Sequence, residues 1–370
     1  MVFTDLLKLM VHKNASDLFV TAGVPPSVKV DGKITPLTKQ ALTPEQARDL
    51  AYSIMNEEQR RDFEATNECN FAIHPVEIGR FRVNVFVQQS RVGMVLRTIS
   101  TYIPKFEELR LPQVMRELAL TKRGMIIFVG GTGTGKSTSM ASMVGYRNAH
   151  TYGHIITIED PIEYVHEHKN CIITQREIGV DTESWEIALV NAMRQAPDVI
   201  QIGEIRTRET MDNAVIFAET GHCCLATLHA NNTYQALDRI INFFPEDRRE
   251  QLLMDLSMNL RALVSQRLLP IKGGKGRVPA VEIMINSPLI SDIILKGHMH
   301  EIRDVIAKSR EAGMQTFDQS LFDLYEMGLV DYEDAVRNAD SANDLRLRIK
   351  LESKGAKTEA LGESMRNVTF

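Results

Sequence analysis

Cysteine is scarce in this chain, and the few cysteines are poorly spaced for their usual structural roles. Four occur among 370 residues, and two of them are adjacent. A disulfide framework needs an even set at regular spacings, and a zinc ribbon needs close pairs, so neither fits. We therefore expect a protein of a reducing compartment, the cytosol. The cysteines are Cys69, Cys171, Cys223 and Cys224.

Long apolar runs are also lacking. A helix that crosses a membrane needs ~20 consecutive apolar residues, and no run in this chain approaches that length. The first ~17 residues contain polar side chains and no small-residue cleavage site, unlike a secretory signal. We expect no membrane span and no export signal, so that any association with a membrane goes through a partner.

The chain has no excess of positive charge. Lys and Arg number 43 and Asp and Glu 48, which gives a formal net charge of -5. Proteins that bind nucleic acid carry a basic surface, so a nucleic-acid motor is disfavoured. The 44% apolar and 25% charged residues are typical of soluble globular proteins. The length of 370 residues predicts two or three globular units.

Residues 1–101 predict a compact α+β domain. It begins with an amphipathic helix and continues through short strands separated by Gly and Pro. Thr43 is a good helix N-cap, because Pro44 follows at the first helical position and Gln46 completes a capping box, so a second helix should run to about Met55. The first helix carries the apolar residues Leu6, Leu7, Leu9 and Met10.

Two arginine-bearing strands follow. In Arg80–Val87, apolar residues alternate with polar ones, which places Arg80 and Arg82 on one exposed face of a strand. Arg97 ends the next strand. Two prolines then bracket a charged stretch over residues 102–112, and we place the interdomain linker there.

Residues 113–350 predict an α/β domain. The apolar run 125–129 has the length of a buried parallel strand, and similar runs at 154–158, 198–202 and 223–229 predict further strands.

The part beyond these strands predicts helices. Apolar residues recur at helical spacing over 252–268, which predicts one long packed helix. A glycine-rich loop tip is expected at 272–276, then helices to about residue 350. The tail over 351–370 contains a single aromatic residue, and we expect it to be disordered.

A glycine-rich loop between a buried strand and a helix carries the chemistry. It satisfies GxxxxGK[ST], in which backbone N–H groups surround a polyphosphate and the following helix adds its positive dipole end. Lys136 would reach the β and γ phosphates of ATP, Ser137 would ligate Mg²⁺, and Thr138 would contact the α phosphate. The candidate nucleotide-binding residues are Gly130, Gly131, Thr132, Gly133, Thr134, Gly135, Lys136, Ser137 and Thr138.

Two acidic segments compete for the other catalytic roles. Hydrolysis needs one carboxylate on the Mg²⁺ side and another that orients the attacking water. We assign Glu204, which follows the strand at 198–202, to the metal, and Glu163, in the segment 159–163, to the water. Asp198 begins its strand and would lie ~20 Å from the phosphate edge. A solvated loop glutamate is the alternative for either acid.

His222 and His229 flank the strand that holds Cys223 and Cys224. A metal site is disfavoured, because adjacent residues of a strand point to opposite faces. A histidine at the carboxyl end of a strand can instead hydrogen-bond the γ phosphate or the catalytic acid.

Four of these segments, in one order, resemble known motifs. GGTGTGKST, TIEDPIEY, QIGEIRTRET and ETGHCCLATLHANNT resemble the Walker A, Asp box, Walker B and His box of the secretion ATPase superfamily. ASDLFVTAGVPP, GRFRVNVFVQQ, MQTFDQSLFDLY and ADSANDLRLRIKL resemble the PilT/PilU twitching-motility branch, so that only the tail is left out.

The resemblance implies a fold and an assembly. The fold would be a PAS-like α+β N-terminal domain joined to a RecA-like P-loop ATPase domain. Six copies would form a homo-hexameric ring that is cytoplasmic and peripheral to the inner membrane at the base of a type IV pilus. ATP and Mg²⁺ would drive pilus retraction.

The resemblance also implies roles for residues. The family's catalytic glutamate falls on Glu163, its Walker B acid on Glu204, and its His box residues on His222 and His229. Its N-terminal domain supplies arginines that meet the bound phosphates, and Arg82 and Arg97 are the matching positions. Positive charge on the departing phosphate is needed, and the loop itself contains no arginine.

One departure favours the PilU-type members. Retraction motors of the PilT type carry an AIRxG-type stretch where this chain has Ser291–Gly297. The implied role is an accessory motor that acts with a PilT-type ATPase and contacts an inner-membrane platform protein of the pilus.

Two other functions stay open. A pilus assembly or secretion ATPase would usually carry an extra N-terminal domain and a four-cysteine zinc module, and this chain has neither. A nucleotide-gated scaffold with little turnover would not need the complete set of hydrolytic motifs.

Overall fold

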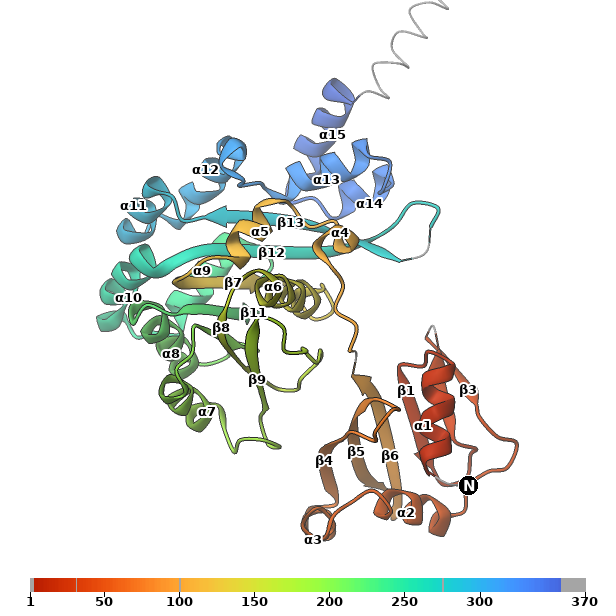
Figure 1. Cartoon of the computed structure of the whole chain (residues 1–370). Helices are drawn as coiled ribbons and strands as arrows, with labels where there is room; N and C mark the ends of the chain where they lie inside the picture. The colour runs from red at the N-terminus through yellow and green to blue at the C-terminus, as the bar shows by residue number, and fades with distance from the viewer. Residues whose placement is uncertain (1–2, 31, 100, 275, 354–370) are drawn as a thin grey trace, which may run out of the picture. The chain divides into compact units, whose positions relative to one another are not determined.

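The structure is a computed structural model of the chain, drawn in Figure 1. It divides into two compact units. The first combines Met1–Tyr102 with Ile162–His166, and the second combines Ile103–Pro161 with Glu167–Phe370. The described residues are 3–30, 32–99, 101–274 and 276–353.

The first unit is an α+β fold. Its described residues form a six-stranded sheet with the order β3-β2-β1-β6-β5-β4, in which every neighbouring pair of strands is antiparallel. The elements are α1 (Phe3–His12), β1 (Asp17–Thr21), β2 (Ser27–Val30), β3 (Lys33–Pro36), α2 (Pro44–Tyr52), α3 (Glu57–Thr66), β4 (Glu68–Ile73), β5 (Arg80–Gln88) and β6 (Arg91–Ile99).

Local sequence explains this unit. Alternation in β5 buries Phe81 and Val83 in the core, whereas Arg82 between them lies on the other face. The predicted capping box of α2 is confirmed, because the Thr43 hydroxyl accepts from Gln46 N and the Gln46 side chain accepts from Thr43 N. The helix ends at Tyr52, slightly before the predicted end.

The second unit is a RecA-like α/β fold. Its elements are α4 (Phe106–Leu109), α5 (Val114–Ala119), β7 (Gly124–Val129), α6 (Lys136–His150), β8 (Gly153–Glu159), β9 (Cys171–Glu177), α7 (Trp185–Ala192), β10 (Val199–Ile202), α8 (Arg208–Glu219), β11 (Cys223–Leu228), α9 (Thr233–Asn242), α10 (Glu246–Asn259), β12 (Leu260–Pro270), β13 (Arg277–Ile285), α11 (Pro288–Lys296), α12 (Ile302–Lys308), α13 (Phe317–Glu326), α14 (Tyr332–Arg337) and α15 (Ala342–Glu352).

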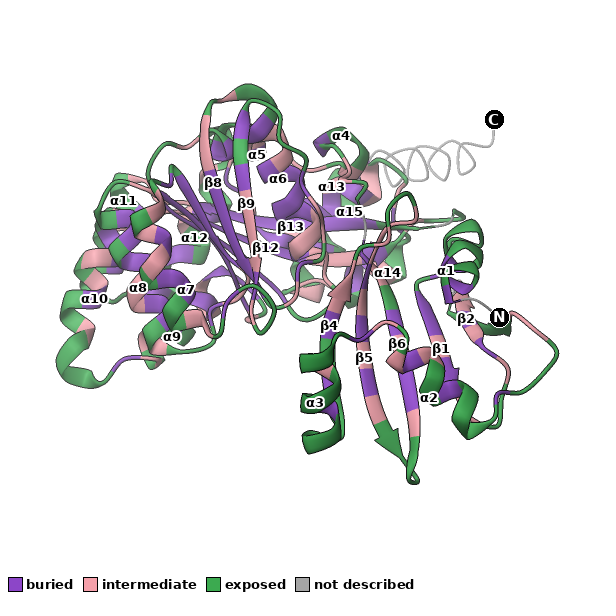
Figure 2. Cartoon of the chain, turned by 60° about the horizontal axis from the view of Figure 1, so that its bottom comes forward, coloured by how far each residue is buried: buried purple, intermediate pink, exposed green. Residues whose placement is uncertain are grey.

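Helices cover both faces of the second unit's sheet. The order is β13-β12-β7-β11-β10-β8-β9, and every neighbouring pair is parallel except β12 with β13. In β7, Ile126 and Phe128 pack with α4, α5 and α6, while Met125, Ile127 and Val129 pack with α7 to α12. A strand buried on both faces explains why its sequence is apolar throughout, and Figure 2 shows this buried sheet in purple.

The prediction of one long helix over 252–268 is wrong beyond Asn259. The chain leaves α10 there and becomes β12, which pairs with β7 and β13. A bulge between Leu260 and Ala262 breaks the alternation of the strand. Because both faces are buried and one residue is inserted, the apolar spacing imitates that of a helix.

The predicted helical remainder is wrong at β13, which pairs with β12 across the glycine-rich tip. The other elements from α11 to α15 are helices, as predicted. Helix α15 continues to Glu352, into the range 351–370 that was predicted as a disordered tail. The rest of that range, 354–370, lies outside the described residues.

A buried acid connects β13 to α9. The Glu282 side chain accepts hydrogen bonds from the backbone N–H of Thr233, at 3.3 Å, and from its hydroxyl. Burial raises the pKa of Glu282 to about 7; Asp340 also raises it, whereas Thr233 and Arg267 lower it.

Replacing this acid should change how stability depends on pH. The pKa of Glu282 is about 7 in the folded protein and ordinarily 4.5, so the folded state binds more protons between these values and stability falls as pH rises through them. In Glu282→Gln this loss, roughly 3 kcal/mol, should disappear. Urea unfolding at pH 5 and pH 8 measures it. The exposed Glu250→Gln serves as the control, and equal pH dependence of all three proteins would contradict the expectation.

Candidate active site

The glycine-rich loop connects β7 to α6, as predicted. Gly135 caps the helix with a φ of +87°, in the left-handed region that favours glycine, and Gly133 has a φ of +77°. Ser137 and Thr138 lie in the first turn of α6 and are half-buried. Backbone N–H groups at the start of a helix have no partner within it, so this turn presents donors to an anion.

Lys136 lies inside the loop. It is 8% exposed, and its Nζ donates hydrogen bonds to the carbonyl oxygens of Gly130 and Gly131, each at 2.8 Å. The Thr134 hydroxyl also donates to Gly131 O, at 2.9 Å. The loop therefore surrounds Lys136, its only lysine, with its own carbonyl oxygens. Oxygens of a bound phosphate can replace these carbonyls as the acceptors of the lysine's hydrogen bonds.

The neighbouring strand β12 limits the space around the loop. The Gln266 side chain accepts a 2.8 Å hydrogen bond from the Ser139 hydroxyl of α6. A Cβ atom on Gly135 would lie 2.6 Å from Gln266 Nε2, and one on Gly130 would lie 2.9 Å from Gln266 O. Sequence reasoning missed Gln266, because it lies between the polar residues Ser265 and Arg267 and no local pattern distinguishes it from them.

Parallel strand pairing brings further groups to this loop. Leu228, the last residue of β11, pairs with Val129, the last of β7, and Gly130 N donates to Leu228 O at 3.2 Å. Strand β10 pairs with β11 and ends at Ile202. The residues just beyond these ends therefore lie at one edge of the sheet, which is where ligands bind in open α/β sheets.

Glu204 and His229 meet at that edge. His229 Nε2 lies 3.1 Å from Glu204 Oε1, and Arg206 donates to the other carboxylate oxygen at 2.7 and 2.8 Å. Sequence reasoning missed Arg206, although it lies two residues after the Walker B acid. The negative charge of Asp160 acts on Arg206 as well.

The environment keeps His229 neutral. Burial lowers the pKa of His229, the positive charge of Lys136 lowers it further, and Glu204 partly opposes them. An ionised carboxylate can only accept hydrogen bonds. The neutral His229 therefore carries its proton on Nε2 and donates a hydrogen bond to Glu204. The influence of Lys136 also shows that the loop, the histidine and the acid share one electrostatic environment.

These groups fit Mg·ATP. The loop offers backbone donors and a lysine to the phosphates, a hydroxyl on Ser137 can ligate Mg²⁺ directly, and a carboxylate on Glu204 can hold a water of its shell. Gly130 and Gly135 of the loop both face β12. A Cβ atom on either would press against Gln266 and change the shape of the loop.

The structure does not bring every predicted residue to this edge. His222 precedes β11, its carbonyl accepts from Gly124 N, and its ring bonds the Thr220 hydroxyl at 3.0 Å. It therefore lies ~20 Å along the strand from His229. The structure therefore does not bring His222 to the loop of the same chain, and its contact with a nucleotide stays a prediction. Asp198 lies at the amino end of its strand as predicted, where it accepts from His154 N at 2.8 Å.

Glu163 belongs to the segment Ile162–His166, which groups with the first unit, and it is exposed. Its water-orienting role stays a prediction. Glu159, in the same acidic segment, is buried and accepts from the Thr157 hydroxyl at 2.6 Å and from Gln175 Nε2 at 3.2 Å. Glu159 therefore has a structural role and does not face a substrate.

The predicted arginines of the first unit lie side by side. Arg82 pairs with Arg97 across β5 and β6, and Arg97 pairs with Asp17 across β6 and β1. Asp17 is buried and accepts from Arg97 Nε at 2.8 Å, while the Arg97 side chain is 72% exposed. The acid orients one edge of the guanidinium and leaves the other edge facing solvent.

Cys223 and Cys224 point to opposite faces of β11, one into each core cluster beside the sheet. Burial raises the pKa of Cys223 to about 11 and also raises that of Cys224. Both behave as apolar core residues.

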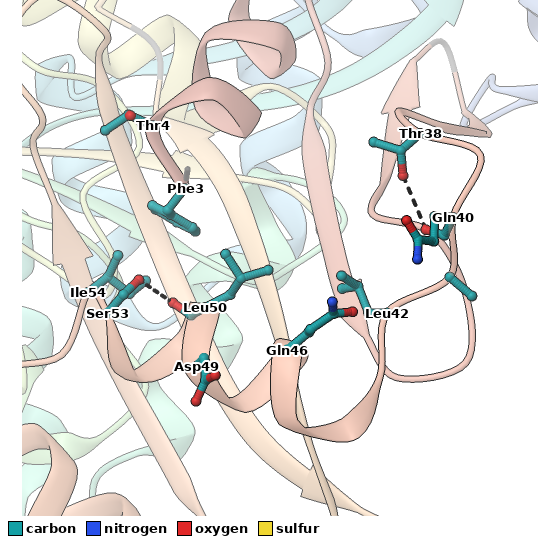
Figure 3. A pocket seen from close by; sticks show the side chains of 11 residues that line it. Phe3, Thr4, Thr38, Gln40, Leu42, Gln46, Asp49, Leu50, Ser53 and Ile54 are labelled. Carbon is teal, nitrogen blue, oxygen red and sulfur yellow. Dashed lines mark hydrogen bonds between the residues drawn. The ribbon is translucent and has the colours of Figure 1, made fainter. Parts of the chain in front are cut away.

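A pocket of about 740 Å³ opens in the first unit, between the start of α1, the residues before α2, and α2 itself (Figure 3). Two of its polar residues bond neighbours in sequence, since the Thr38 hydroxyl donates to Gln40 O and the Ser53 hydroxyl to Leu50 O. The apolar part of its lining comes from Phe3, Leu42, Leu50 and Ile54.

No helix within the described part of the chain is both long and apolar enough to cross a membrane.

The fold and the site define a P-loop ATPase, and comparisons with known proteins agree. Residues 81–278 match the family model described as type II/IV secretion system protein. The chain is 62% identical to the type IV pilus ATPase PilU of Pseudomonas aeruginosa, over 96% of this chain and 93% of that protein. It is 40% identical to PilT of the same organism, over 92% and 98%.

A solved structure is similar over nearly the whole length. The crystal structure of the pilus retraction motor PilT with bound ADP superposes with a TM-score of 0.88 at 41% identity, covering 94% of this chain and 99% of that one. The chain therefore belongs to the type II/IV secretion ATPase family, in its PilT/PilU branch.

Gly135 and Gly133 give a matched test of the cradle. Alanine at either position is strained by the positive φ, at ~1 kcal/mol, but only at Gly135 must it displace the Gln266 amide from Ser139. We expect Gly135→Ala to lower the free energy of unfolding by ~1–3 kcal/mol more than Gly133→Ala. Urea unfolding of the nucleotide-free protein measures the difference, and equal losses would contradict the packing argument.

Proposed function

We propose that this ATPase is a Mg²⁺-dependent motor for type IV pilus retraction, assembled as a homo-hexameric ring in the cytoplasm at the inner membrane. The observation that carries the proposal is the convergence of Lys136, His229 and Glu204 at one edge of the sheet. The names of the similar Pseudomonas proteins support the pilus role, and the ADP bound in PilT supports a nucleotide as ligand.

The higher identity to PilU than to PilT, 62% against 40%, favours an accessory motor that acts with a PilT-type partner. An inner-membrane platform protein of the pilus is the proposed target of the ring. Domain motion across the linker at 102–112 would convert each catalytic cycle into force.

The first catalytic task is to hold the triphosphate. Lys136 Nζ exchanges its two loop carbonyls for oxygens of the β and γ phosphates, and the first turn of α6 donates backbone N–H groups to them. When bound, Mg²⁺ supplies charge that neutralises the phosphate oxygens. Ser137 is its proposed direct ligand, and Glu204 holds it through water.

The second task is to orient the attacking water, which we assign to Glu163. His229 donates to Glu204 and keeps that carboxylate in place beside the loop. Because the histidine is neutral, it can donate this proton without adding positive charge. Loss of the γ phosphate would change the charge that both groups face, so the pair is suited to sense the nucleotide state.

The third task is to stabilise charge on the departing phosphate. Arg82 and Arg97 are the proposed donors, supplied by the first unit of a neighbouring copy in the ring. Asp17 leaves the solvent-facing edge of the Arg97 guanidinium open for two parallel hydrogen bonds to a phosphate.

Replacing Lys136 or Glu163 should nearly abolish ATP turnover. Lys136→Ala removes the charge that binds the phosphates, and Glu163→Gln removes the carboxylate that orients water, so we expect both to reduce kcat by ~10³-fold or more with the fold intact. Steady-state phosphate release from the purified proteins measures turnover, with circular dichroism for the fold. Wild-type turnover in Glu163→Gln would refute its assigned role.

Mixing variants tests whether sites are completed by a neighbour. Arg97→Ala and Lys136→Ala would damage different halves of shared sites, so mixed rings should recover part of the activity that each lacks alone. Lys136→Ala mixed with Glu204→Gln is the matched control, because both lesions lie in the same half and should give no recovery. Demonstrably mixed rings without recovery for the first pair would contradict a site completed in trans.

A further inference from the structure

The segment that carries His229 is short and firmly anchored. Residues 229–232 join β11 to α9. At its start, Leu228 O accepts from Gly130 N of the phosphate loop at 3.2 Å. At its end, the buried Asn232 caps α9 by accepting from Gln235 N at 3.0 Å. Glu282 holds the first residue of α9 from the strand behind.

Two side chains of β12 hold the middle of this segment. Asn231 O accepts from Arg267 Nη2 at 3.3 Å and from the Ser265 hydroxyl at 3.4 Å. Asn231 lies only two residues after His229, so fixing its peptide limits the directions in which the imidazole can point. Gln266, between these two side chains, contacts the phosphate loop and α6.

Arg267 is itself fixed by α13 and by the residues that join α14 to α15. Its guanidinium lies 3.9 Å above the ring of Phe317 in α13. It also donates to Asn338 O at 2.5 Å and to Asp340 at 2.7 Å. In Figure 1, α13, α14 and α15 lie beside the β12–β13 hairpin, consistent with the core cluster that they share with it.

We propose that Arg267 is a positioning residue for ATP hydrolysis, which holds the backbone of Asn231 and thereby aims His229 at Glu204. The inference rests on the proposed role of His229 and Glu204 in the reaction. The arginine touches neither the nucleotide loop nor the acid, so its effect passes through the segment 229–232. Its anchors on Phe317 and Asp340 make the C-terminal helices part of the support of the active site.

Arg348, in α15, provides a matched control. Its guanidinium lies 4.3 Å above the ring of Phe322, also in α13, and it pairs with Glu352 at 2.9 Å. Among the described residues, Arg348 makes no hydrogen bond, ion pair or ring contact with the segment 229–232. An arginine that merely fastens α13 should therefore behave like Arg348, whereas a positioning residue should not.

The test compares Arg267→Ala, Arg348→Ala and His229→Ala in the full-length ATPase. We expect Arg267→Ala to lower kcat by ~10–100-fold, with KM for ATP and the Kd for a fluorescent ADP analogue changed less than ~3-fold. Arg348→Ala should keep wild-type kcat with a similar decrease in Tm. Equal kcat in the two arginine variants would overturn the proposal.

Two further measurements separate the possible failures. If Arg267 acts through His229, the double variant should lose no more kcat than His229→Ala alone, and additive losses would overturn the proposal. Wild-type kcat in His229→Ala would instead refute the proposed role of the histidine. Arg267→Lys keeps the charge but loses the planar fork, so it should retain intermediate kcat, and it replaces Arg267→Ala if that variant fails to fold.

Discussion

The parallel pairing of β7, β11 and β10 is the constraint on which the rest of the site depends. It sets the carboxyl ends of three strands at one edge, so that Gly130, His229 and Glu204 follow their strands at nearly the same height. Backbone hydrogen bonds in a sheet covered on both faces fix their separation, and a slip of one residue would turn every core side chain of β7 to the opposite face.

Charge balance follows from this arrangement. A lysine, an arginine and a carboxylate lie around one histidine, and the histidine is held neutral by burial and by the lysine. One carboxylate oxygen of Glu204 accepts from His229, and the other accepts from two nitrogens of Arg206. A ligand with several negative charges would meet a site whose positive groups are already ordered and whose acid is already shielded, which lowers the reorganisation needed on binding.

Sequence alone predicted the parts that are encoded locally. The strand, loop and helix around Lys136, the capping box at Thr43 and the acid after β10 each occupy a few adjacent residues. The errors arose where long-range pairing decides the structure. Beyond Asn259, strand pairing and a bulge override a helix-like spacing, and the contacts of Gln266 and Arg267 join segments that no local pattern connects. The distance of His222 from the loop of the same chain could have been inferred from the sequence, because the predicted strand begins after it.

The burial of the four cysteines has a practical consequence. All four lie in the described part of the chain and are buried, so the native surface there offers thiol reagents little to modify. A single cysteine introduced on an exposed position would then be the preferred target of a maleimide fluorophore or a spin label. With two cysteines introduced in one unit, the distance between their labels could be measured through a nucleotide cycle. The native thiols would not first have to be removed.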